Sequence, residues 1–119
     1  MNIQMHEYPI TKRIIEIAEE FANKNNGKEV KQINLIVGDY SGYVASSIEL
    51  YFEIIAEGPL QPLHKAKLNI ERVKPKLKCT RCGELFERKV FSFQCPICSG
   101  DGVPTEIGKE FYIKSIEIE

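Results

Sequence analysis

The sequence is poor in the features that mark several large classes of protein. Across 119 residues it has no tryptophan, two histidines and a formal net charge of −1. Such a balanced charge gives no general attraction to nucleic acid or to an anionic membrane. No apolar run approaches the roughly 20 residues of a membrane span, and residues 1–7 lack the basic and apolar regions of a secretory signal peptide. We therefore expect a cytoplasmic protein without membrane or nucleic-acid partners.

Catalytic motifs are missing as well. The chain has no phosphate-binding loop and no paired-carboxylate motif, and neither histidine lies near a candidate nucleophile in the sequence. We therefore expect that the protein is not an enzyme.

What the chain does contain is four cysteines arranged as two Cys-x-x-Cys pairs. Cys79 and Cys82 form the first pair, and Cys95 and Cys98 follow after a spacer of twelve residues. Two residues between paired cysteines allow both thiolates to bind one ion, and the spacer suits a short hairpin that brings the pairs together. The pattern predicts a closed tetrahedral site, and Zn²⁺ is the ion expected for four thiolates.

Other interpretations of the cysteines are two disulfides, a redox pair or buried free thiols, and a rubredoxin-like iron site uses similar pairs. Two matched pairs favour a metal site, and a closed site that needs no redox activity favours zinc over iron. Because a closed site has no open position for a substrate, we expect its role to be structural or regulatory. Gly83 and the Ser99-Gly100 dipeptide follow the two pairs and suit the tight turns of such a site.

Two segments have the apolar periodicity of amphipathic helices. The first covers residues 9–25, and its apolar residues predict this buried face: Ile10, Ile14, Ile17, Ala18, Phe21 and Ala22. The second covers residues 46–57, where Ser46 and Glu49 have the spacing of a capping box. Its predicted buried residues are Ile48, Tyr51, Phe52 and Ile55.

Three segments, at residues 30–37, 66–70 and 111–118, have strand character. In the last segment Ile113 and Ile116 are three residues apart, which shifts the alternation and predicts a β-bulge. We expect this last strand to join the first two in one sheet, because it is too apolar to stand alone.

These elements predict an α+β fold. Two helices cover one face of a three-stranded sheet, and a four-cysteine zinc-ribbon lobe is inserted before the last strand. The α/β domain comprises residues 1–74 and 107–119, and the zinc-binding lobe comprises residues 75–106.

Residues 72–89 form a basic stretch with seven basic residues against Glu84 and Glu87, a local net charge of +5. One interpretation is a nucleic-acid patch. The favoured interpretation is that these cations offset the charge of about −2 that zinc carries with four thiolates.

The N-terminal region contains a second candidate metal site. His6 follows Met5 directly, and an amine, the next backbone nitrogen and the imidazole can chelate one ion through consecutive small rings. Such nitrogen-rich sites suit Ni(II) or Cu(II), although a histidine near a terminus is more often simply solvated. His64 lies in an expected loop without a nearby partner ligand, and we interpret it as a surface residue.

Several separate motifs, in the same order, resemble those of the HypA/HybF family of nickel metallochaperones for [NiFe]-hydrogenase maturation. The N-terminal segment Met5-His6-Glu7, the loop segment 36–42 and the helix end at 52–58 are similar to family motifs. The two cysteine pairs resemble the zinc lobe of the family, and residues 113–117 resemble its closing strand.

The resemblance implies a function that the spacing alone does not. It implies that Ni(II) is bound by His6 and adjoining backbone nitrogens within the Met5-His6-Glu7 segment, with Glu7 beside the ion. It also implies delivery, together with a HypB-type GTPase, to the [NiFe]-hydrogenase large subunit, and in some bacteria a role with urease maturation proteins. The four cysteines would hold structural zinc. Alternatives are a zinc-ribbon module that binds nucleic acid or protein, and a rubredoxin-like electron carrier.

One departure from the family pattern concerns the start of the chain. Family members begin at the methionine of Met-His-Glu, whereas residues 1–4 precede Met5 here. With these residues present, the amide of Met5 replaces an amine, or Met1 folds back to supply one. The simpler interpretation is that translation starts at Met5, which then carries the free amine itself.

Overall fold

The computed structural model describes residues 6–58, 62–89 and 92–119. The elements occur in the order α1 (Glu7–Lys24), β1 (Val30–Gly38), α2 (Ala45–Ala56), β2 (Lys67–Val73), β3 (Leu77–Cys79), β4 (Leu85–Phe86), β5 (Gly102–Pro104) and β6 (Phe111–Ile118).

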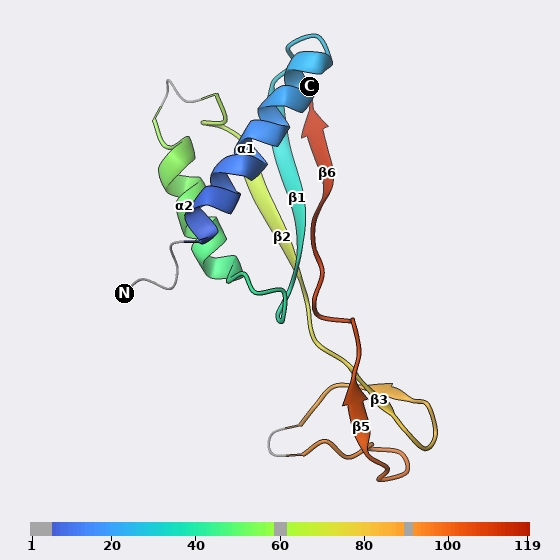
Figure 1. Cartoon of the computed structure of the whole chain (residues 1–119). Helices are drawn as coiled ribbons and strands as arrows, with labels where there is room; N and C mark the ends of the chain where they lie inside the picture. Colours follow the sequence, from blue (N-terminus) through green and yellow to red (C-terminus); the bar gives the residue numbers. More distant parts are fainter. Residues whose placement is uncertain (1–5, 59–61, 90–91) are drawn as a thin grey trace.

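The larger sheet has the strand order β2-β1-β6. Its central strand β1 pairs in parallel with β2 and antiparallel with β6, and α1 and α2 lie on one side of it (Figure 1). This arrangement confirms the predicted α+β fold, including the return of the last strand to the first sheet.

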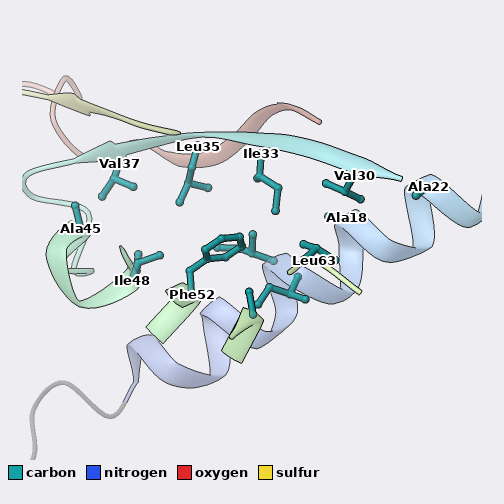
Figure 2. Packing of buried hydrophobic residues seen from close by; sticks show 13 residues of the cluster. Ala18, Ala22, Val30, Ile33, Leu35, Val37, Ala45, Ile48, Phe52 and Leu63 are labelled. Atoms are coloured by element: carbon teal, nitrogen blue, oxygen red, sulfur yellow. The ribbon is translucent and has the colours of Figure 1, made fainter. Parts of the chain in front are cut away.

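The main core lies between β1 and the two helices. Ile33, Leu35 and Val37 alternate along β1 and are almost fully buried, and Figure 2 shows them pointing from the strand toward Phe52 and Ile48 of α2. Alternate residues of a strand point to the same face, so one apolar row is enough to bury the helices against the sheet.

The buried side of α1 is displaced from the predicted one. Ile14, Ile15, Ala18 and Ala22 are buried, whereas Phe21 is 40% exposed. The apolar residues of this helix occupy a wider part of its circumference than the stripe of residues that is buried against the sheet. Phe21 lies beside that stripe because each helical residue is rotated by about 100° from the previous one.

The predicted capping box at the start of α2 is wrong. The helix begins at Ala45 with Val44 as its N-cap, and no side chain of the cap residue forms a capping hydrogen bond. Ser46 therefore lies inside the first turn. The N–H group of Val44 instead donates, at 2.8 Å, to Oε2 of Glu7, which is a residue of α1.

The β-bulge predicted in the last strand is confirmed. The register between β1 and β6 shifts between the pairs Asn34–Ser115 and Leu35–Ile113. The extra residue returns both Ile113 and Ile116 to the side of the sheet that packs against the core.

The second sheet is small and has the strand order β4-β3-β5. It carries its own buried cluster of Leu77, Cys79, Phe86 and Cys95. No strand pairing joins the two sheets within the described residues, and the molecule is elongated, with extents of 56 × 36 × 16 Å.

Two chain segments join the sheets and run side by side at their junction (Figure 1). The N–H of Lys76 in one segment donates to the Ile107 carbonyl in the other at 3.4 Å. A Cβ atom on Gly38 would lie 2.1 Å from the Gly108 carbonyl oxygen, and one on Gly108 would lie 2.7 Å from Pro75 Cα. Only glycine allows such close approach, so these contacts fix the junction between the end of β1 and the two segments.

Within the described residues, neither helix is both long and apolar enough to cross a bilayer.

Candidate metal centres

The sulfur atoms of all four cysteines converge on one point. They lie within 4.8 Å of one another, with 3.4 Å between Cys79 and Cys98 and 3.7 Å between Cys82 and Cys95. A tetrahedral ion with metal–sulfur bonds of about 2.3 Å requires sulfur separations of about 3.8 Å. The cysteines form no disulfide, and the geometry fits one metal ion held by four thiolates.

Each cysteine pair begins the same five-residue turn. In the first turn the Gly83 N–H donates to the Cys79 carbonyl at 3.1 Å, and in the second the Ser99 N–H donates to the Cys95 carbonyl at 2.9 Å. The backbone N–H groups of Cys82 and Ile97 point at sulfur atoms, at 3.4 Å each. These N–H groups stabilise negative charge on the sulfurs.

The residue that closes each turn has a left-handed backbone. Its φ angle is +79° at Gly83 and +63° at Ser99. Gly100 is needed for a different reason, because a Cβ atom there would lie 2.9 Å from Cys79 Sγ and 3.3 Å from Cys98 Sγ. The cluster therefore requires a residue without a side chain at Gly100 and a left-handed residue at Ser99.

The electrostatics of the cluster call for a cation. Backbone N–H donation, chiefly from Cys82, lowers the pKa of Cys79 to about 6. The N–H of Glu84 lowers the pKa of Cys82, but burial and the neighbouring thiol groups outweigh it and raise this pKa to about 12. Four sulfurs at this spacing therefore cannot all ionise unless a positive ion binds between them.

The basic stretch at 72–89 contributes little to the cluster. Arg81 donates from Nη1 to the Cys98 carbonyl at 3.2 Å, and among the described residues this is the one side-chain hydrogen bond from a basic residue of the stretch to the two turns. Four other basic residues line a cleft instead: Lys74, Lys76, Arg88 and Lys89. The prediction that nearby cations offset the charge of the zinc site is therefore supported by a direct contact only at Arg81.

His6 lies at the N-cap of α1, and its side chain is 54% exposed. Its Nε2 atom is 2.8 Å from the Gly42 carbonyl oxygen and 3.2 Å from Glu7 Oε2. Its ring also lies 5.2 Å from the ring of Tyr43. The imidazole is thus held against the loop between β1 and α2.

Glu7 is fully buried although its side chain is acidic. Its Oε2 atom accepts the Val44 N–H and faces His6, while Oε1 is buried without a hydrogen-bond partner among the described residues. Thr11 Oγ1 donates to the Glu7 backbone carbonyl at 2.6 Å. The carboxylate therefore lies between the N-terminal segment and α2 and does not face the solvent.

The remaining sequence candidates lie apart from this pair. Met5 lies outside the described residues. His64 is exposed in a turn between α2 and β2 and forms no hydrogen bond or ion pair with a described residue. The structure thus brings together His6 and Glu7, and separately the four cysteines.

Sequence reasoning missed the contribution of the loop that precedes α2. Gly42 supplies a carbonyl and Val44 an N–H group to the N-terminal segment, and Tyr43 packs between His6 and Phe111. The polar contacts from this loop come from main-chain atoms, which carry no residue-specific signal. The glycine itself was visible, since it ends the loop segment 36–42.

Comparisons with known proteins give matches over nearly the whole chain. Residues 5–118 match the family model described as "HypA: Hydrogenase/urease nickel incorporation, metallochaperone, hypA". The chain is 39% identical to the hydrogenase maturation factor HypA of Caldanaerobacter subterraneus subsp. tengcongensis, over 97% of this chain and all of the relative. It is 37% identical to the protein of the same name from Geobacter metallireducens, with the same coverage of both chains.

Solved structures show the same similarity. A solution structure of a HypA protein superimposes with a TM-score of 0.63 at 27% identity, covering 97% of each chain. The solution structure of the Ni metallochaperone HypA from Helicobacter pylori gives a TM-score of 0.58 at 26% identity, over 94% of this chain and 96% of that one.

Proposed function

Because the chain belongs to the HypA family of hydrogenase and urease nickel-incorporation metallochaperones, we propose that it binds Ni(II) at Met5-His6-Glu7 and delivers it for [NiFe]-hydrogenase maturation. The observation that carries this proposal is the orientation of His6. A carbonyl oxygen only accepts hydrogen bonds, so contact with the Gly42 carbonyl requires the hydrogen on Nε2. In the neutral ring Nδ1 is then the basic nitrogen that can bind a metal ion.

The backbone at the start of α1 suits this chemistry. Nδ1 and the backbone nitrogen of His6 close a six-membered ring with one bound ion. The first N–H groups of a helix have no carbonyl acceptor within that helix. If Ni(II) replaces such a proton on the nitrogen and the proton passes to the solvent, no helical hydrogen bond is broken, and the helix N-terminus stabilises the negative charge that results.

Glu7 assists through His6. Its carboxylate lies 3.2 Å from Nε2, and a carboxylate or carbonyl on the remote ring nitrogen orients a histidine ligand and increases its basicity. We assign Glu7 as a positioning residue whose negative charge also favours a divalent cation nearby.

We propose Zn²⁺ as the ion of the four-cysteine site, held by Cys79, Cys82, Cys95 and Cys98. The sulfur spacing fits tetrahedral coordination, and bound zinc would supply a cross-link between the two turns without redox chemistry. On this basis the chain comprises a nickel-binding α/β domain, residues 1–74 and 107–119, and a zinc-binding lobe, residues 75–106.

The remaining parts of the proposal follow from family membership. We propose that the protein acts in the cytoplasm without catalysing a reaction, with a HypB-type GTPase and the [NiFe]-hydrogenase large subunit as partners. A reducing compartment supports the thiolate site. Urease maturation proteins are further candidate partners, since the family description includes urease.

The test is a pair of histidine variants. His6→Ala should abolish nickel binding in isothermal titration and leave the zinc content, measured by elemental analysis, at one ion per chain. His64→Ala is the matched control and should keep both ions. Full nickel binding by His6→Ala would overturn the assigned site, and iron in place of zinc would overturn the structural-zinc assignment in favour of a rubredoxin-like centre.

A further inference from the structure

A cleft of about 510 Å³ lies where the two sheets meet. One wall comes from Asp39 and Tyr40, which follow β1, and the other from the residues after β4 and around β5. The two segments that join the sheets in Figure 1 also line it, through residues such as Pro75 and Ile107. Neither His6 nor any cysteine contributes to it, so the cleft is separate from both metal centres.

The cleft is positively charged. Five basic and two acidic side chains line it, a net charge of +3, and the basic ones are Lys74, Lys76, Arg88, Lys89 and Lys109. Lys76 is paired with Glu87, and Lys109 with Glu106. Within the described part of the chain, the other three form no ion pair, so their charge is available to an anionic ligand.

Apolar groups lie between these charges. Pro75, Leu77, Pro104 and Ile107 line the cleft, and Phe93 is half exposed at its edge. The guanidinium of Arg88 stacks over the Phe93 ring at 4.2 Å. Exposed aromatic and arginine side chains are typical anchors of protein interfaces.

We propose that this cleft docks an acidic segment of a partner protein. Carboxylates of that segment would contact Lys74, Arg88 and Lys89, and an apolar side chain would pack against Phe93. The inference goes beyond nickel binding and stands without it, because neither His6 nor Glu7 lines the cleft.

A protein segment fits better than nucleic acid for two reasons. The whole chain has a net charge of −1, whereas nucleic-acid-binding domains are usually strongly basic. In addition, the proline and aliphatic lining suits apolar side chains, while single-stranded nucleic acid needs a basic groove with several stacking aromatics.

The cleft also shares a loop with the N-terminal segment. Asp39 and Tyr40 line the cleft, and Gly42 and Val44 of the same loop hold His6 and Glu7. A docked segment would therefore lie against the loop that holds the proposed nickel ligand.

The test uses a short fluorescein-labelled peptide in which Glu and Asp alternate with Leu, titrated with nickel-free protein and followed by anisotropy. Lys74→Glu combined with Lys89→Glu should weaken binding by about tenfold or more. Binding to the wild type should fall as NaCl rises from about 50 to 300 mM. Lys28→Glu with Lys65→Glu is the matched control, because it changes the net charge by the same −4 at exposed sites outside the cleft and should leave binding unchanged.

Three further arms make the result decisive. Phe93→Ala should remove the preference for Leu over Ser at the apolar positions of the peptide, and His6→Ala should bind the peptide as the wild type does. Zinc content and circular dichroism should be unchanged in every variant. The proposal is overturned if the wild type does not bind the acidic peptide, or if both lysine pairs weaken it equally. It is also overturned if an oligothymidine binds the wild type more tightly than the acidic peptide does and this binding is lost in the double variant Lys74→Glu with Lys89→Glu. The cleft would then bind nucleic acid.

Discussion

At the scale of single residues, the carboxylate of Glu7 caps a helix to which it does not belong. In a capping box, an acidic residue of the first turn accepts the N–H of its own N-cap. Here Glu7 of α1 accepts the N–H of Val44, the N-cap of α2. Its negative charge also interacts favourably with the N-terminus of α2, so one side chain joins the two helices at the proposed nickel segment.

Two substitutions at Glu7 should separate these roles. Glu7→Gln keeps an acceptor of similar shape but loses the charge, so nickel affinity should fall about tenfold with little loss of stability. Glu7→Ala leaves the Val44 N–H without its acceptor and should lower the free energy of unfolding by about 2 kcal/mol. Urea unfolding and nickel titration measure the two effects. The control Glu53→Ala, on the exposed side of α2, should stay within about 0.5 kcal/mol, and an equally stable Glu7→Ala would contradict the capping role.

The two left-handed residues of the cysteine turns give opposite expectations. A Cβ atom added at Gly83 would meet no other atom within 4 Å, so Gly83→Ala introduces no clash. It should nevertheless cost about 1 kcal/mol from the left-handed backbone alone and weaken zinc binding several-fold. Ser99→Gly removes the same strain and should bind zinc at least as tightly as the wild type. Competition with a chromophoric chelator measures both, and tighter binding by Gly83→Ala would contradict the argument.

At the scale of elements, strongly periodic features were predictable and main-chain contacts were not. The β-bulge followed from the spacing of Ile113 and Ile116, because both must reach one core. The four-cysteine centre followed from spacing as well. The cap of α2 could not be predicted in this way. Ser46 and Glu49 have the spacing of a capping box, but the N–H of the N-cap Val44 is accepted by Glu7, which lies 37 residues away from Val44 in the sequence.

The small sheet should depend on its metal site more than the large one does. Cys79 and Cys95 make up half of its buried cluster, so Cys95→Ser removes a zinc ligand and part of the packing. We expect β3, β4 and β5 to lose order while β1, β2 and β6 keep their amide signals in NMR spectra. Wild-type protein treated with a zinc chelator should give the same pattern. Loss of dispersion across the whole spectrum would show that the two sheets unfold together.

At the scale of the whole molecule, acid should act on the small sheet first. The pKa of Cys79 is lowered to about 6, so its thiolate is present above that pH and is lost as the pH falls through it. Cys82, with a pKa raised to about 12, must lose a proton to the solvent when zinc binds at any pH below that value.

Zinc affinity should therefore fall as the pH falls. Below pH 6 Cys79 is protonated too, so each zinc ion that binds must displace about one proton more, and the affinity should fall more steeply with pH. Chelator competition between about pH 5 and 8 measures the slope, and circular dichroism reports the helices. A slope that does not change near pH 6, or helices that unfold before zinc is released, would contradict this expectation.

The junction between the sheets has a consequence for how such chains can be recombined. Val73, the last residue of β2, pairs with Gly38, and Phe111, the first residue of β6, pairs with Val37. The two points flank the end of β1, about 10 Å apart, which is two strand spacings. A turn of a few residues spans that gap, so the lobe can be excised and β2 linked directly to β6. Lobes from related chains can then be grafted at this point, which would replace the cleft residues after β4 and around β5 and leave His6 and Glu7 in place.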